Sequence, residues 1–376
     1  MLSNDLFSRV SGKRIRDVWM CLKAYSFVLE LFDKYVSLPS ALNVHFGSSS
    51  IYAGLMHLSM NGGYAESAMT DLTLRYGIDA PCGGAFLYRL RKVEYDEWYS
   101  RLRDVNDSIL SLASKLVLLS EPVVCAIDYT KIPYYGEFNR YVVRSKHEHG
   151  TNRFYEYAAI SIVQNGVRLC IYSRPVTLLD TKGEVVRELI DEAWKRGVRI
   201  KHLLLDRAFF TVECINLLKT MSIEFIMPCV KNERVKDAIS SASERTFQFS
   251  IHDENKNEAS FTMLLHRRQI DGVILAFATS RNNAAILDAI PDEYRKRWGI
   301  ETSFRKLKEV YGMTTSQSPA IRMLYFMTAM ILYNVWQIIN MMLMTESQED
   351  PPAKGRYRVT VPLMVTIFCA HLNGRL

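Results

Sequence analysis

The sequence lacks the features that define several classes of protein. Its seven cysteines are scattered and form no Cys-x-x-Cys pair, so neither a zinc site nor a disulfide framework is expected. It contains no internal repeat and no low-complexity tract. The chain does not open with a basic segment followed by an apolar run, so no signal peptide is predicted. We therefore expect a cytoplasmic protein.

A strong charge of either sign is also missing. The chain has 47 Lys and Arg against 40 Asp and Glu, a formal net charge of +7. This balance permits an anionic partner but does not identify one. With 376 residues, 48% hydrophobic and 23% charged, the chain has the composition of an ordinary globular protein and the length of two or three domains.

One apolar run, Met323 to Met344, is about long enough to span a membrane. However, Asn334, Gln337 and Asn340 recur at intervals of three residues and make one helical face polar. No second run of this kind exists. We predict a long, mostly buried helix and no membrane partner.

Residues 1–118 show little β pattern and are predicted to form an all-α N-terminal domain. Tyr64 to Tyr76 reads as a helix, Gly77 to Pro81 as a turn and Gly84 to Val93 as a basic helix. This order is the outline of a helix-turn-helix. Because consecutive amphipathic helices are common, the domain either reads DNA or serves packing or dimerisation.

From residue 119 the pattern becomes α/β. Val123 to Ile127 is an apolar run, predicted as a buried strand that ends at Asp128. A second apolar strand, His202 to Leu205, ends at Asp206. We predict a mixed-sheet core in 119–230, a β insertion in 231–285, core helices in 286–345, and a linker with a basic tail in 346–376.

The segment from Tyr294 to Lys308 is predicted as a helix. One narrow face carries polar and charged side chains, namely Tyr294, Arg297, Glu301, Arg305 and Lys308. The adjoining face is apolar and is expected to face the core, through Ile300, Phe304, Leu307 and Tyr311. In an isolated helix this pattern is typical of a solvated face with i,i+4 ion pairs.

Three carboxylates stand out by placement: Asp128 and Asp206 at strand ends, and Glu301 among cations on the helix. Functional residues of open α/β sheets gather at the carboxyl ends of strands. Their oxygens suit the hard divalent cations Mg²⁺ and Mn²⁺. Two such ions can catalyse in-line phosphoryl transfer, and the cations on the helix would hold a polyanionic substrate.

The chain resembles the DDE transposases of bacterial and archaeal insertion sequences, in the branch with a Tyr-x2-Arg-x3-Glu-x6-Lys signature. That signature fits without a gap at Tyr294, Arg297, Glu301 and Lys308. The segments 126–130 and 204–209 are similar to the first and second aspartate blocks of the family. The resemblance covers about residues 120–345.

The resemblance implies an RNase H-like core with two Mg²⁺ or Mn²⁺ ions held by Asp128, Asp206 and Glu301. Such enzymes cleave DNA at transposon ends and transfer the freed 3′-hydroxyl to a target strand. It also implies phosphate contacts by Tyr294, Arg297 and Lys308; Arg305 shares their helix face but lies outside the signature. The implied partners are double-stranded DNA and a second copy of the chain, on chromosomal DNA in the cytoplasm.

One departure concerns the β insertion. Relatives that close a hairpin on the DNA end stack a flipped base on a tryptophan there, but residues 225–285 contain none. Phe247, Phe249 and Phe261 are either substitutes or core residues. Two other functions stay open: a metal-dependent nuclease or immobile relative of a transposase, and a DNA-binding protein with a vestigial site.

Overall fold

The computed structural model describes residues 12–39, 45–115, 121–164, 167–281, 289–347 and 357–372. The chain divides into two compact units, one formed by residues 1–118 with 303–376 and the other by residues 119–302.

The unit 119–302 is built on one sheet. Its strands in chain order are β1 (Val123–Pro133), β2 (Val142–Glu148), β3 (Thr151–Ile162), β4 (Cys170–Pro175), β5 (Ile200–Leu205), β6 (Phe225–Pro228), β7 (Thr246–His252), β8 (Glu258–Arg267) and β9 (Ile274–Thr279). They lie in the order β2-β3-β1-β5-β6-β9-β8-β7, and β4 pairs with β3. β1, β5 and β6 are parallel neighbours, and the other pairs are antiparallel.

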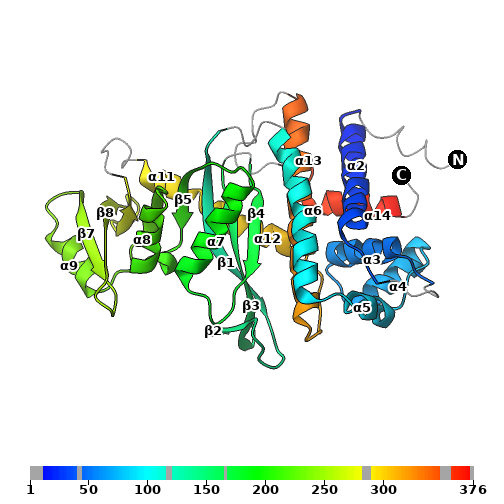
Figure 1. Cartoon of the computed structure of the whole chain (residues 1–376). Helices are drawn as coiled ribbons and strands as arrows, with labels where there is room; N and C mark the ends of the chain where they lie inside the picture. Colours follow the sequence, from blue (N-terminus) through cyan, green and yellow to red (C-terminus); the bar gives the residue numbers. More distant parts are fainter. Residues whose placement is uncertain are drawn as a thin grey trace. The chain divides into compact units, whose positions relative to one another are not determined.

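Helices cover both faces of this sheet (Figure 1). They are α7 (Lys182–Lys195), the 3₁₀ turn η1 (Arg207–Phe209), α8 (Val212–Thr220), α9 (Glu233–Ser241), α11 (Ile290–Arg295) and α12 (Trp298–Lys308). α7 and α8 lie in front of the central strands in Figure 1, and α11 and α12 lie behind them. This explains the continuous apolar runs of β1 and β5, since a strand covered on both faces has no side for polar residues.

The predicted β insertion is not a separate body. β9 pairs with β6 in the core, with Met227 opposite Ala278, and β8 and β7 follow outward. The insertion therefore lengthens the core sheet. It also contains α9, where the sequence pattern had indicated no helix. Asn232 caps that helix by accepting from the amide of Val235.

Two local predictions were wrong. The first strand does not end at Asp128 but runs to Pro133, because β1 keeps its antiparallel pairing with β3 after its parallel pairing with β5 has ended at Ile127. The segment 294–308 is not one helix but two, α11 and α12. The turn between them is closed by i to i−3 hydrogen bonds, from the amide of Arg297 to Tyr294 and from that of Ile300 to Arg297.

The second unit is helical. Its helices are α2 (Gly12–Tyr35), α3 (Ser48–Asn61), α4 (Ala65–Tyr76), α5 (Gly83–Leu90), α6 (Tyr95–Lys115), the end of α12, α13 (Pro319–Ser347) and α14 (Val361–Leu372). α3 and α14 had not been predicted. α14 packs on α2 and α3, so part of the predicted linker and tail is folded; 348–356 lie outside the described residues.

This division differs from the predicted domains at residue 303. We had assigned 286–345 to the catalytic core, but from Ser303 onward the chain clusters with the N-terminal helices. The polar face of α13 explains the attachment. Asn334 donates to Asn106 of α6 at 2.8 Å, and Asn340 both donates to the carbonyl of Val359 and accepts from its amide.

The apolar run at 323–344 lies within α13 and is buried, as predicted. By length and composition, Pro319–Met344 passes as a membrane span, but 94% of its most apolar window is buried inside the protein. Its polar residues find partners on α6 and near α14, as expected of a core helix in a folded domain.

Candidate active site

Asp128 and Asp206 lie side by side. Ile127 of β1 is paired with Leu205 of β5, and each aspartate is the next residue along its strand. Neighbouring strands are about 4.8 Å apart, so the two backbones hold the carboxylates close together at one edge of the parallel pair. This is the arrangement that the two strand-end aspartates predicted.

Local hydrogen bonds fix both aspartates. The Oδ1 atom of Asp128 accepts from the amide of Tyr129 at 2.8 Å, and that of Asp206 accepts from the amide of Arg207 at 2.6 Å, where Asp206 caps η1. The ring of Tyr129 stacks on Phe209 at 5.0 Å between centroids. The turn after Asp206 is therefore packed against the strand that carries Asp128.

Arg297 joins the third carboxylate to the first. Its Nη1 donates to Oδ2 of Asp128 at 2.9 Å, and its Nη2 donates to Oε1 of Glu301. The Arg297 side chain is only 9% exposed, whereas that of Glu301 is 51% exposed. The break between α11 and α12 turns Arg297 inward, so it does not share the exposure of the predicted charged face.

The pKa of Asp128 reflects these surroundings. Burial raises the pKa of Asp128 to about 6, against the lowering effects of Arg297 and of the Tyr129 amide. The charges of Asp206 and Glu301 raise this pKa further. Asp128 therefore senses both other carboxylates, as expected of groups that share one site.

Asp128, Asp206 and Glu301 suit a divalent metal by the chemistry of their oxygens, but their side chains are not arranged around a common point in this structure. Within the described ranges, no three His, Cys, Asp or Glu side chains are placed to hold a metal ion together. Arg297 occupies one oxygen of Asp128 and one of Glu301. The carboxylates are hard oxygen donors whose mutual repulsion a dication relieves, provided that Arg297 releases them.

The other predicted DNA contacts lie on the same two helices. Tyr294 packs against Phe277 at 5.2 Å, and the Arg297 guanidinium lies 5.7 Å from its ring centre. Burial raises the pKa of Tyr294. Arg305 and Lys308 are exposed on the last turns of α12, past the point where the chain enters the helical unit. Their contact with DNA stays a prediction.

Glu156 is a neighbour of the site that the sequence pattern did not single out. It lies on β3 next to β1, 3.7 Å from Lys131. Burial raises its pKa, Lys131 lowers it, and Asp128 raises it again. The signal that would have found it is a single carboxylate inside the apolar run from Phe154 to Ile162.

Three phenylalanines of the insertion, Phe247, Phe249 and Phe261, form one cluster. Phe249 lies 5.9 Å from Phe261 and 6.3 Å from Phe247, and Phe261 also meets Phe210 at 5.4 Å. Phe261 is buried, which favours its core interpretation; Phe247 and Phe249 are half-buried.

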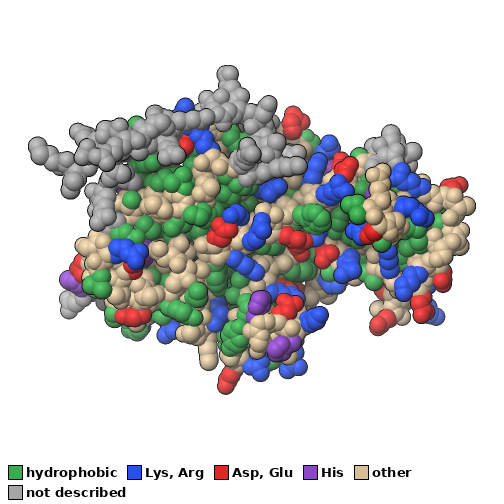
Figure 2. All heavy atoms as spheres, turned by 180° about the vertical axis from the view of Figure 1, so that it is seen from behind, with side chains coloured by type: hydrophobic (Ala, Val, Ile, Leu, Met, Phe, Trp, Pro, Cys, Tyr) green, Lys and Arg blue, Asp and Glu red, His purple; other side chains and the backbone are tan. Residues whose placement is uncertain are grey.

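On the face seen in Figure 2, Lys and Arg side chains are interspersed with Asp and Glu.

Among solved structures, the chain is similar to piggyBac transposase in a cryo-EM structure of its synaptic complex with hairpin DNA. The TM-score is 0.55 at 11% identity, over 97% of this chain and 80% of that chain. A likeness at this identity defines the fold, and the mixed-sheet unit is an RNase H-like core. The family model described as transposase DDE domain matches residues 119–335. The chain thus belongs to the DDE transposase family. A search of curated proteins finds no match.

Proposed function

We propose that this protein is a DNA transposase that cleaves the ends of a mobile element and joins the freed 3′ ends to target DNA. The observation that carries the proposal is the placement of Asp128 beside Asp206, with Glu301 tied to Asp128 through Arg297. Family membership and the RNase H-like core support it.

In this proposal two of the three carboxylates are already fixed in place. Asp128 is fixed on a covered strand and Asp206 at the cap of η1, so neither needs to be ordered when substrate arrives. Two Mg²⁺ or Mn²⁺ ions held by Asp128, Asp206 and Glu301 would supply Lewis acidity for attack of water or a 3′-hydroxyl on a phosphodiester. Arg297 then exchanges its carboxylate partners for a DNA phosphate, which its planar fork also fits.

The proposed partner is double-stranded DNA, held as a pair of ends by a homodimer on the chromosome. The proposed phosphate contacts are Arg297 and, in addition, Tyr294, Arg305 and Lys308. The piggyBac transposase structure of similar fold is a synaptic complex with hairpin DNA.

The test uses a plasmid that carries this reading frame with its natural flanking DNA. Purified protein with Mg²⁺ is expected to release the element and to produce joined products with a second plasmid, and EDTA is expected to abolish both. Asp128→Asn and Glu301→Gln should lose at least about a thousandfold in rate, the usual order for an essential catalytic group, while still binding end DNA. Asp237→Asn, an exposed position on α9, is the matched control.

The outcomes separate the three functions. Cleavage without any joined product indicates a nuclease or an immobile relative. Binding without cleavage under either Mg²⁺ or Mn²⁺ indicates a DNA-binding protein with a vestigial site and refutes the proposal.

A further inference from the structure

Two neighbouring leucines stand exposed in the loop between β4 and α7. The side chain of Leu178 is 64% exposed and that of Leu179 is 91% exposed. Single exposed leucines are ordinary on protein surfaces. Two in succession, on a short loop that hydrogen bonds hold at both ends, call for a functional reason.

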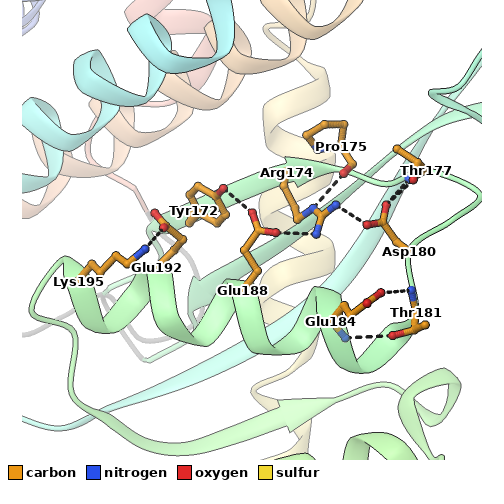
Figure 3. Close-up of polar contacts among 10 residues, drawn as sticks. All are labelled: Tyr172, Arg174, Pro175, Thr177, Asp180, Thr181, Glu184, Glu188, Glu192 and Lys195. Atoms are coloured by element: carbon orange, nitrogen blue, oxygen red, sulfur yellow. Dashed lines mark hydrogen bonds and ion pairs between the residues drawn. The ribbon is translucent and has the colours of Figure 1, made fainter. Parts of the chain in front are cut away.

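The base of this loop is tied down by a polar network (Figure 3). Asp180 accepts from the amide of Thr177 at 2.6 Å and from its hydroxyl at 2.8 Å. Arg174 donates to Asp180 at 2.5 Å and to Glu188 of α7 at 2.6 Å. The two leucines lie between Thr177 and Asp180, so the network fixes the loop without burying them.

The far end of the loop is equally fixed. Thr181 and Glu184 form a capping box at the start of α7, and the Thr181 hydroxyl donates to Glu213 of α8 at 2.6 Å. A loop with bonds at both ends loses little conformational entropy on contact with a partner.

The sheet register relates the strand before this loop to Asp128. Asp128 of β1 pairs with Ala159 of β3, which pairs with Ser173 of β4. Two strand spacings, about 10 Å, separate Asp128 from Ser173. β4 runs in the same direction as β1, so the loop after Val176 leaves the sheet at the edge where Asp206 follows β5.

A direct contact confirms this proximity. The Nζ of Lys182 donates to the carbonyl of Ala208 in η1, the turn that Asp206 caps, at 2.5 Å. Lys182 and Arg207 are exposed, and Arg174 offsets the charges of Asp180 and Glu188. The major groove of B-DNA is about 12 Å wide, which is similar to the two strand spacings between Asp128 and Ser173. DNA with a phosphate at Asp128 and Asp206 would therefore extend as far as the strand that leads into this loop.

We propose that Leu178 and Leu179, the leucine wedge, insert between base pairs of DNA next to the phosphate that is cleaved. Apolar side chains used in this way unstack a base step and bend the duplex. This proposal rests on the proposed function, because it assigns to the same site a means of opening the DNA end before cleavage.

The experiment compares paired and unpaired DNA. The double variant Leu178→Ala/Leu179→Ala is expected to cleave a fully paired element end at least about tenfold more slowly than wild type, because unstacking costs a few kcal/mol per step. On an end with mismatches beside the cleavage site, it is expected to cleave at the wild-type rate. Ile270→Ala, 95% exposed in the β8–β9 turn, is the matched control for loss of an exposed apolar side chain.

A second readout does not need cleavage. With 2-aminopurine next to the cleavage site, wild-type binding should increase fluorescence as the base unstacks, and the double variant should bind without that increase. If wild type cleaves no DNA, the proposed function fails while this signal still tests the wedge.

Equal loss on paired and mismatched DNA, no loss on either, or no fluorescence difference would overturn the wedge. So would a variant that changes its oligomeric state without DNA, measured by light scattering, because the loop would then be a protein contact.

Discussion

Arg297 shows how a residue can satisfy a sequence motif and still occupy an unexpected place. The helical periodicity placed it on one polar face with Tyr294, and the family resemblance implied that both contact DNA phosphates. The structure instead buries it between Asp128 and Glu301. Sequence periodicity could not show this, because the break between α11 and α12 depends on i to i−3 hydrogen bonds rather than on residue type.

The buried pair with Asp128 leads to a stability prediction. At pH 8, above the pKa of Asp128, Arg297→Gln leaves a buried carboxylate without its cation, and we expect a loss of about 3 kcal/mol in unfolding free energy. Added Mg²⁺ should restore part of this loss, because a dication can replace the guanidinium charge. Thermal unfolding with and without Mg²⁺ measures both effects.

Arg295→Gln is the matched control for that measurement. Arg295 is 68% exposed and pairs with Asp292, which is 80% exposed, so its removal should change stability by less than about 0.5 kcal/mol. An Arg297→Gln variant as stable as this control would show that the pair with Asp128 contributes nothing.

His202 lies on β5, the strand that leads to Asp206. Its burial leads to a prediction about how stability depends on pH. Burial lowers its pKa from 6.5 to about 4, and the charged groups that act on it are Glu293, Arg281, Lys201 and Lys296. Above pH 6.5 neither the folded nor the unfolded state is protonated. As pH falls toward 4 only the unfolded state takes up the proton, so stability should decrease by up to about 3 kcal/mol.

Urea unfolding at pH 7 and pH 4.5 tests this linkage. His202→Gln should remove most of the acid-induced loss, since Gln does not titrate and can still accept from Arg281. His252→Gln, an exposed position on β7, should leave the loss unchanged. An identical pH dependence in all three proteins would exclude His202 as its source.

At the scale of elements, helix α5 is held against α4 by a close approach at Gly83. A Cβ at Gly83 would lie 2.5 Å from the backbone nitrogen of Glu66 and 2.6 Å from its Cα. The Gly83 amide also donates to the Glu66 carboxylate at 2.8 Å. Both atoms in the clash belong to the backbone, so a side chain there requires one helix to move.

Gly83→Ala should therefore destabilise the helical unit by about 1–3 kcal/mol. Gly84→Ala is the control next to it, because no described atom lies within 4 Å of its added Cβ. That change should be neutral or stabilise by up to about 1 kcal/mol, as expected for Ala in a helix. Chemical unfolding compares the two, and equal stabilities would contradict the close approach.

Elements with one clear periodicity were predictable from the sequence. The apolar runs of β1 and β5 and the long α13 fall where the pattern put them. α9 was missed although its sequence is amphipathic, because it is only nine residues long and buries a single residue, Val235. α14 is apolar on most sides, and only its packing on α2 and α3 shows what it buries.

At the scale of the whole molecule, the two aspartates could be predicted as neighbours because parallel strands end at one edge. The sequence could not show that α13 belongs to the helical unit, because its partners Asn106 and Val359 lie on segments far apart in sequence. Contact between distant segments leaves no trace in local periodicity.

The burial of α13 gives a prediction about the intact protein. Although Pro319–Met344 passes as a membrane span, its apolar surface is occupied inside the helical unit. The folded protein should remain in the aqueous phase of a Triton X-114 separation, and protein heated above its unfolding temperature should move to the detergent phase. Folded protein found in the detergent phase would show that α13 is available to lipid.

The helical unit is discontinuous, with residues 119–302 inserted between its two parts. During synthesis, the RNase H-like core emerges whole before α13 leaves the ribosome. The face of α6 that packs on α13, where Asn106 bonds to Asn334, must wait for a partner encoded later in the chain. We therefore expect the core to complete its folding on the ribosome before the helical unit that begins earlier in the sequence.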